Sequence, residues 1–326
     1  MKNRLPNKSE IRTRKMRPYA SYVTIPLLLL AIFLIGSCSN SANNAADTMT
    51  AKIKRGDYLV NAVANCMHCH ADRNFTKFSG PTVAGTEGKG GQRKVVYVSN
   101  ITPTVLGHWT DQEIERAITT GITNVGDTLF PTMPYANYKY LTRYDAESIV
   151  AYLRTLKPLP DSVPRRNLAQ LPWKLATLYQ NWYTNDIYQA LDHQTDKDLL
   201  KGKYLVTIGG CVGCHSNLDR KLLAYKRDSL LAGGLLSNNL ANKFKVTSAN
   251  ITPDTTTGIG GWTEETFLAK FTSYRDREMY DYDPGRYNSE MPWTIFANMT
   301  DDDIRSIYKY LRTIKPIKNK PTKWPQ

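Results

Sequence analysis

The sequence of 326 residues predicts an all-α protein built from two tandem domains of one fold. An internal repeat indicates the duplication, because short motifs occur twice in the same order, at an offset that grows from 145 to 158 residues. Helix-capping signals and apolar residues at helical spacing lie between the motifs, and no stretch alternates convincingly as a strand would. The repeated motifs are Gly56–Val60 and Gly202–Val206, Asn100–Pro103 and Asn250–Pro253, Trp109–Thr110 and Trp262–Thr263, and Tyr152–Thr155 and Tyr310–Thr313.

The first segment, residues 1–37, has the pattern of an export signal. Its first 20 residues hold seven Lys or Arg and one acidic residue, Glu10, and an apolar run of 12 residues follows from Ile25 to Gly36. This run is short for a membrane span, which needs about 20 apolar residues. The basic flank and the small residues after the run are typical of a secretory signal that is removed.

The end of this signal, Ile35–Cys38, resembles a bacterial lipobox, which makes Cys38 the predicted site of lipidation. The alternative is an ordinary signal peptide followed by an incidental cysteine. Residues 38–51 are rich in Ser, Asn and Ala and are expected to form a flexible tether. The protein is therefore expected in the bacterial cell envelope, lipid-anchored and facing the periplasm, with the choice of inner or outer membrane open.

Two Cys-x-x-Cys-His pentapeptides, Cys66–His70 and Cys211–His215, carry the strongest chemical signal. Two thiols two residues apart on a helical turn can form thioethers to the vinyl groups of a haem, and the next imidazole can bind the iron. The sequence thus predicts two covalently bound haem c groups. Their predicted protein ligands are Cys66, Cys69 and His70 in the first copy and Cys211, Cys214 and His215 in the second.

Two other uses of these cysteines remain open. Disulfides would be chemically possible in an exported protein, but they give no reason for a histidine after both pairs. A zinc ribbon needs two such pairs roughly 15 to 20 residues apart, whereas these lie 145 residues apart. With Cys38 assigned to the lipid and four cysteines to haem, all five are accounted for.

The first predicted domain is residues 52–157. A short helix is expected to lead into Cys66, and a middle helix at Asp111–Thr120 follows a capping box in which Glu113 is the third helical residue. A closing helix is predicted at Tyr144–Leu156. The segment Gly85–Gly91 is expected to be a glycine-rich loop.

A connector at residues 158–200 leads to the second predicted domain, residues 201–316, and a basic tail at 317–326. The middle helix of this copy is predicted at Glu264–Tyr274, after a loop at Gly258–Gly261, and the closing helix at Asp301–Ile314. One face of the closing helix is apolar and is expected to pack against the opening helix and the haem. That face comprises Ile304, Ile307, Tyr308, Leu311 and Ile314.

The repeat also selects a sixth ligand for each iron. Met133 and Met291 each precede a proline, lie before the closing helix, and are separated by 158 residues. A methionine thioether opposite the histidine favours reduced iron and raises the potential. Met299 aligns with Leu141 and is expected in the core, and Met279 has no counterpart in the first copy.

Other histidines and the repeated tryptophans have less specific roles. His68, His108 and His193 are not repeated, so surface or packing roles are expected for them. Trp109, Trp262 and the Asn-Ile-Thr-Pro turns have two possible roles. They either line the haem edge and support its propionates, or they are structural, with the tryptophans as buried aromatic residues and the motifs as fixed turns.

The ordered motifs over residues 52–316, with the connector around Leu171–Leu175, resemble the mono- and dihaem cytochrome c family. They are especially similar to the cytochrome subunits of membrane-associated alcohol, aldehyde and gluconate dehydrogenases. The resemblance implies two class I cytochrome c-like domains, each wrapped around one haem, with His70 and Met133, and His215 and Met291, as axial ligands. The chain departs from those subunits in having two haem motifs where they usually have three.

This resemblance implies an electron carrier rather than an enzyme with a catalytic residue. Electrons would come from a periplasmic or membrane-bound dehydrogenase or a quinol-oxidising complex and pass to a terminal oxidase or another cytochrome. A dihaem oxidoreductase similar to a peroxidase or a thiosulfate dehydrogenase is the alternative. The chain has a net charge of +14, or +8 without residues 1–37, which favours acidic docking partners. Nucleic acid is excluded by location.

Overall fold

The computed structural model describes residues 48–70, 82–87, 93–129, 133–160, 196–219, 224–238, 245–276, 278–281 and 291–325. The chain divides into two compact units, Met1–Met49 and Thr50–Gln326, and both Cys-x-x-Cys-His motifs belong to the second. The predicted signal, Cys38, His193 and most of the connector lie outside the described residues. No helix in the described part of the chain has the length and apolar character needed to cross a membrane.

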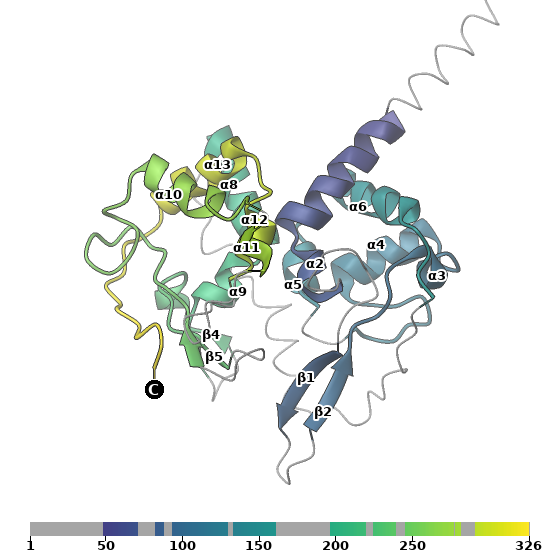
Figure 1. The fold of residues 1–326 in the computed structure, drawn as a ribbon, viewed down its shortest axis with the longest axis horizontal. Coiled ribbons are helices and arrows are strands. Elements are labelled where there is room, and N and C mark those ends of the chain that lie inside the picture. Colours follow the sequence, from purple (N-terminus) through teal and green to yellow (C-terminus); the bar gives the residue numbers. More distant parts are fainter. Residues whose placement is uncertain are drawn as a thin grey trace, which may run out of the picture. The chain divides into compact units, whose positions relative to one another are not determined.

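The first half of the described chain, residues 48–160, is mostly helical (Figure 1). It opens with a helix over residues 48–58, which reaches back into the expected tether and continues as a π-helical turn, η1. The elements that follow are η1 (Leu59–Val63), α2 (Cys66–His70), β1 (Thr82–Glu87), β2 (Arg93–Tyr97), α3 (Pro103–Leu106), α4 (Asp111–Thr120), α5 (Tyr135–Tyr138) and α6 (Arg143–Thr155).

The second half, residues 196–325, repeats the order of the principal helices (Figure 1). An opening helix leads into the cysteine motif, a middle helix follows, and a short helix after Met-Pro precedes the closing helix. The elements are α8 (Lys197–Ile208), α9 (Cys211–His215), β3 (Leu218–Asp219), β4 (Ala224–Tyr225), η4 (Arg227–Ser229), β5 (Leu236–Asn238), β6 (Lys245–Thr247), α10 (Glu264–Thr272), α11 (Glu278–Asp281), α12 (Trp293–Phe296) and α13 (Asp301–Leu311).

Threonine residues begin the middle and closing helices of both halves. The predicted capping box is present in α4, where Thr110 Oγ1 accepts from the Glu113 backbone N–H and the Glu113 carboxylate accepts from the Thr110 N–H. Thr142, Thr263 and Thr300 accept from the third helical N–H of α6, α10 and α13. These bonds satisfy donors that a helix leaves unpaired, so the sequence sets the helix starts.

The opening and closing helices pack against each other in both halves. In the second half α13 lies along α8, and its Ile304, Ile307 and Leu311 are buried, as the apolar face predicted. In the first half α6 packs against η1. Burial of these faces supplies the main hydrophobic stabilisation of each half.

Three short two-stranded ladders correct the expectation of an all-helical chain. Strands β1 and β2, β3 and β4, and β5 and β6 pair antiparallel. Strand β1 includes Gly85, which was predicted to lie in a loop. The run Lys94–Tyr97 includes β-branched and aromatic residues that favour strands, and several glycines precede it in the sequence. These runs are too short to show a clear alternation.

One glycine in each opening helix allows the helices to approach closely. A Cβ atom at Gly56 would lie 1.9 Å from the Ser148 carbonyl oxygen of α6, and one at Gly202 would lie 2.1 Å from the Ser306 carbonyl oxygen of α13. Only a residue without a side chain fits at such separations, which is why the repeated motif starts with glycine.

We predict that Gly56→Ala and Gly202→Ala each destabilise the protein by about 1–3 kcal/mol, because the added methyl group overpacks the crossing. This loss outweighs the gain of about 1 kcal/mol that alanine brings to an exposed helix. Urea unfolding followed by circular dichroism measures the change. Gly261→Ala is the control, because its Cβ would be 3.8 Å from the nearest atom. Equal or greater stability of the two helix variants would contradict the prediction.

Candidate haem sites

A left-handed residue directly precedes each cysteine motif. Asn65 has φ of 58° between η1 and α2, and Gly210 has φ of 72° between α8 and α9. Asparagine and glycine are among the residue types that tolerate this conformation. The chain therefore ends one helix and starts a new helical turn at the first cysteine, which places the two cysteines three residues apart on one face.

None of the four motif cysteines forms a disulfide in the described part of the chain. Burial raises the pKa of Cys66 to about 12 and that of Cys211 to about 12, and the paired cysteine of each motif raises it further. A thioether is neutral and therefore suits a position beside the apolar core. Among the described residues, no group of three or more His, Cys, Asp and Glu side chains could hold a metal ion.

Each motif histidine is oriented by a backbone carbonyl. His70 Nδ1 donates to Ser99 O at 2.9 Å, and His215 Nδ1 donates to Ala249 O at 2.8 Å. Because a carbonyl can only accept, the proton belongs on Nδ1, and Nε2 keeps its lone pair. Burial lowers the pKa of His70 to about 4 and also lowers the pKa of His215. Both imidazoles are thus neutral near pH 7, in the tautomer that an iron ligand needs.

The carbonyls that orient the histidines belong to the residues before the Asn-Ile-Thr-Pro turns. Asn100 Oδ1 accepts from the N–H and hydroxyl of Thr102, and Asn100 Nδ2 donates to Leu159 O. Asn250 makes the same bonds to Thr252 and to Ile317 O. These asparagines fix the turn to the segment after the closing helix. The repeated motif was visible in the sequence, but its connection to the histidine was not predicted.

Met133 and Met291 occupy equivalent places in the two halves. Each lies two residues before a short helix, α5 or α12, and its carbonyl accepts a 2.8 Å hydrogen bond from the first helical N–H. Both side chains are partly buried against the hydrophobic core. Met299 is 3% exposed, which agrees with a core role. Met279 lies in α11.

Two tyrosines that the sequence did not single out, and Arg154 of the repeated motif Tyr152–Thr155, support the sites. The Tyr138 hydroxyl of α5 donates to Ala64 O, just before the first cysteine motif. In the second half, Tyr225 Oη donates to Gly213 O inside the motif at 3.1 Å. Arg154 donates to Trp109 O and Leu106 O and joins α6 to the loop before α4. These ties cross between elements distant in sequence, so no local pattern could reveal them.

The repeated tryptophans have structural contacts. Trp109 is partly buried and its carbonyl accepts from Arg154, whereas Trp262 is 36% exposed and its carbonyl accepts from Tyr308 Oη. His68 and His108 are exposed, consistent with the surface roles expected for them. Each half therefore contains the motif cysteines, one oriented imidazole and a Met-Pro methionine partly buried against the core.

Residues 199–315 match the family model for cytochrome c. This part of the chain is a cytochrome c domain. It begins in α8, ends after α13, and includes Cys211, Cys214, His215 and Met291. The family implies a covalently bound haem c, and the paired cysteines and oriented imidazole of the second half fit such a group.

Full-length comparisons extend the similarity beyond this domain. The chain is 28% identical to the gluconate 2-dehydrogenase cytochrome c subunit of Pantoea cypripedii over 88% of this chain and 64% of that protein. It is 27% identical to the fructose dehydrogenase cytochrome subunit of Gluconobacter japonicus, over 92% of this chain and 60% of that protein. It is 26% identical to a diheme cytochrome c-type protein of Cereibacter sphaeroides, over 82% of this chain and 88% of that protein. The chain spans about three fifths of the length of the dehydrogenase subunits it matches.

We predict that Met133→Ala and Met291→Ala each abolish the methionine-to-iron charge-transfer absorption of a different haem. The midpoint potential of that haem falls by something on the order of 0.1 V, within the roughly 0.8 V range that axial ligands span. Optical and paramagnetic spectra during a potentiometric titration measure both effects.

The control for these variants is Met299→Leu, which alters a buried core methionine and is expected to leave both signatures intact. Retention of two methionine signatures in either alanine variant would instead assign the ligand to another residue, with Met279 as the local candidate.

Proposed function

We propose that the chain is a dihaem electron-transfer cytochrome with a cytochrome c domain in each half. One observation carries the proposal: the first half repeats the site of the matched second half. Both halves have a left-handed residue before the cysteines, a histidine Nδ1 bonded to the carbonyl before Asn-Ile-Thr, and a Met-Pro at the start of a short helix. Equivalent local chemistry supports equivalent haem attachment at Cys66, Cys69, Cys211 and Cys214.

The residues of the chain bind and tune the cofactor. Haem iron, when bound, supplies a reversible one-electron change. The cysteines would attach the group covalently, His70 and His215 would present Nε2, and Met133 and Met291 would provide soft thioether ligands that favour the reduced state. The buried core around η1 and α8 limits water, which also affects the potential. The proposed role requires no nucleophile or general base.

A dehydrogenase or a quinol-oxidising complex is the proposed electron donor, and a terminal oxidase or another cytochrome is the proposed acceptor. The cytochrome subunits of gluconate and fructose dehydrogenases among the relatives support the donor class. The excess of basic residues favours acidic docking surfaces on these partners. Such contacts would be transient and salt-sensitive.

We predict that the purified holoprotein contains two haem c groups per chain and titrates as two one-electron centres. It should accept and donate electrons without turning over peroxide or thiosulfate, because both proposed irons have two axial protein ligands. A pyridine haemochrome assay, a redox titration and two substrate assays measure these properties. Steady turnover of either substrate would replace the carrier function with the dihaem oxidoreductase alternative, and one haem per chain would overturn the dihaem assignment.

We also propose that Cys38 carries lipid and anchors the protein to a membrane on its periplasmic side. Cys38→Ser should shift the protein from the membrane to the soluble fraction, because it removes the acceptor sulfur. Mass spectrometry of the mature N-terminus should find the lipid on the wild type alone, and Ser39→Ala serves as the matched control. A wild-type N-terminus without lipid would indicate an ordinary signal peptide.

A further inference from the structure

Two hydrogen bonds join the halves of the chain in a reciprocal manner. Tyr58 Oη, on the opening helix of the first half, donates to Asp303 Oδ2 of α13 at 2.5 Å. Tyr204 Oη, on α8 in the second half, donates to Asp145 Oδ2 of α6 at 2.6 Å. In the repeat, Tyr58 corresponds to Tyr204 and Asp145 to Asp303. Each half therefore uses the same donor and the same acceptor, as in an isologous interface between two subunits.

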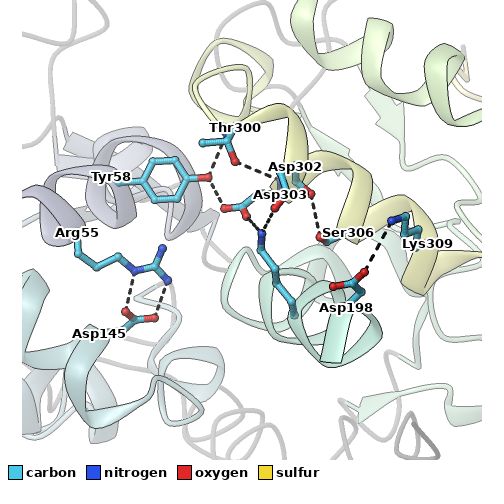
Figure 2. Close-up of polar contacts among 10 residues, drawn as sticks. Arg55, Tyr58, Asp145, Asp198, Thr300, Asp302, Asp303, Ser306 and Lys309 are labelled. Atoms are coloured by element: carbon cyan, nitrogen blue, oxygen red, sulfur yellow. Dashed lines mark hydrogen bonds and ion pairs between the residues drawn. The ribbon is translucent and has the colours of Figure 1, made fainter. Parts of the chain in front are cut away.

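Each aspartate also has a cationic partner in its own half. Arg55 makes a bidentate pair with Asp145, with N···O distances of 2.8 and 2.9 Å. Lys201, the counterpart of Arg55, lies 2.5 Å from Asp303 Oδ1. Figure 2 shows Arg55 directed at Asp145 and the Tyr58 hydroxyl directed at Asp303. Each carboxylate is thus held by a cation from its own half and a phenol from the other.

The tyrosine oxygens also accept from the N-cap residues of the closing helices. The Thr300 N–H donates to Tyr58 Oη at 3.1 Å, and the Thr142 N–H makes a longer bond to Tyr204 Oη at 3.4 Å (Figure 2 shows the former). Burial and the aspartate acceptors raise the pKa of both tyrosines, so both remain protonated donors. Each phenol therefore both donates and accepts within the same interface.

The aspartates are costly to leave without these partners. The side chains of Asp145 and Asp303 are only 5% and 8% exposed. A buried carboxylate is stable only when paired and hydrogen-bonded. Separation of the halves would remove the tyrosine hydrogen bond from both aspartates at once. Any other arrangement of the two halves therefore has a higher free energy.

The elements at this interface also carry the proposed haem ligands. The helix with Tyr58 continues through η1 to Cys66, and the helix with Tyr204 ends just before Cys211. Short helix α12, which follows Met291, packs against η1 of the other half. Short helix α5, which follows Met133, packs in the same way against α8. The relative placement of the two haem sites thus depends on how these helices dock.

We propose that the Tyr58–Asp303 and Tyr204–Asp145 contacts dock the two halves in one orientation and fix the separation of their haem sites. Tyr58 and Tyr204 are then positioning residues for electron exchange between the halves, because electron tunnelling slows steeply with distance. This role rests on the proposed dihaem function. A covalent connector alone keeps the halves close but does not fix their orientation.

The test uses the full-length holoprotein with Tyr58→Phe, Tyr204→Phe and both together. Each lost hydroxyl lowers the ratio of docked to undocked molecules by roughly tenfold. The double variant should have a larger radius of gyration in small-angle X-ray scattering. After rapid partial reduction, electron exchange between the two haems of one molecule appears as a phase whose rate does not depend on protein concentration. The rate of this phase should fall by about tenfold or more in the double variant. The two midpoint potentials and methionine signatures should stay unchanged, which a general loss of structure would not allow.

Tyr308→Phe is the matched control, because Tyr308 Oη donates to Trp262 O within the second half at 2.7 Å. It should leave scattering and exchange at wild-type values. If the double variant does not fold by circular dichroism, the single variants provide the same comparison at smaller amplitude. Unchanged scattering and exchange in the tyrosine variants, or an equal loss in the control, would overturn the proposal. A haem count of one per chain would overturn the dihaem function instead, while the scattering would still test docking.

Discussion

The close crossing of the opening and closing helices is the constraint on which each half depends. Gly56 and Gly202 let their helix backbones lie close to the carbonyl groups of Ser148 and Ser306. The gap is too small for any side chain. The serine hydroxyls fold back onto their own helices and leave the contact surface flat. This crossing fixes the direction in which the opening helix delivers the cysteine motif.

The histidine orientation depends on the same closing helix through a longer route. The chain beyond α6 or α13 binds the side chain of Asn100 or Asn250, and this bond holds the turn beside it. The residue before this turn supplies the carbonyl that accepts the hydrogen bond from Nδ1 of the motif histidine. Helix packing, turn geometry and imidazole tautomer are therefore one connected system, which explains why the motifs recur together.

The two halves are chemically alike but not identical at their shared surface. The guanidinium of Arg55 forms a planar bidentate pair with Asp145, whereas the ammonium of Lys201 divides its contacts between Asp303 and Asp302. A planar fork restricts its carboxylate more than a point charge does. The second half also has an aromatic cluster in which Phe271 packs edge-on to Trp293. Each half therefore gives its site a different surrounding on a common scaffold.

The sequence by itself determined the repeated motifs and the helix starts, and it predicts the residue types for haem attachment. The threonine caps and Cys-x-x-Cys-His motifs are local patterns, so nearby residues suffice to predict the capped helix starts and to identify haem-type motifs. Tertiary structure decided the short hairpins, the carbonyl partners of His70 and His215, and the reciprocal tyrosine–aspartate contacts. Those features join residues up to 245 positions apart, and only the packing of helices brings such residues within hydrogen-bonding distance.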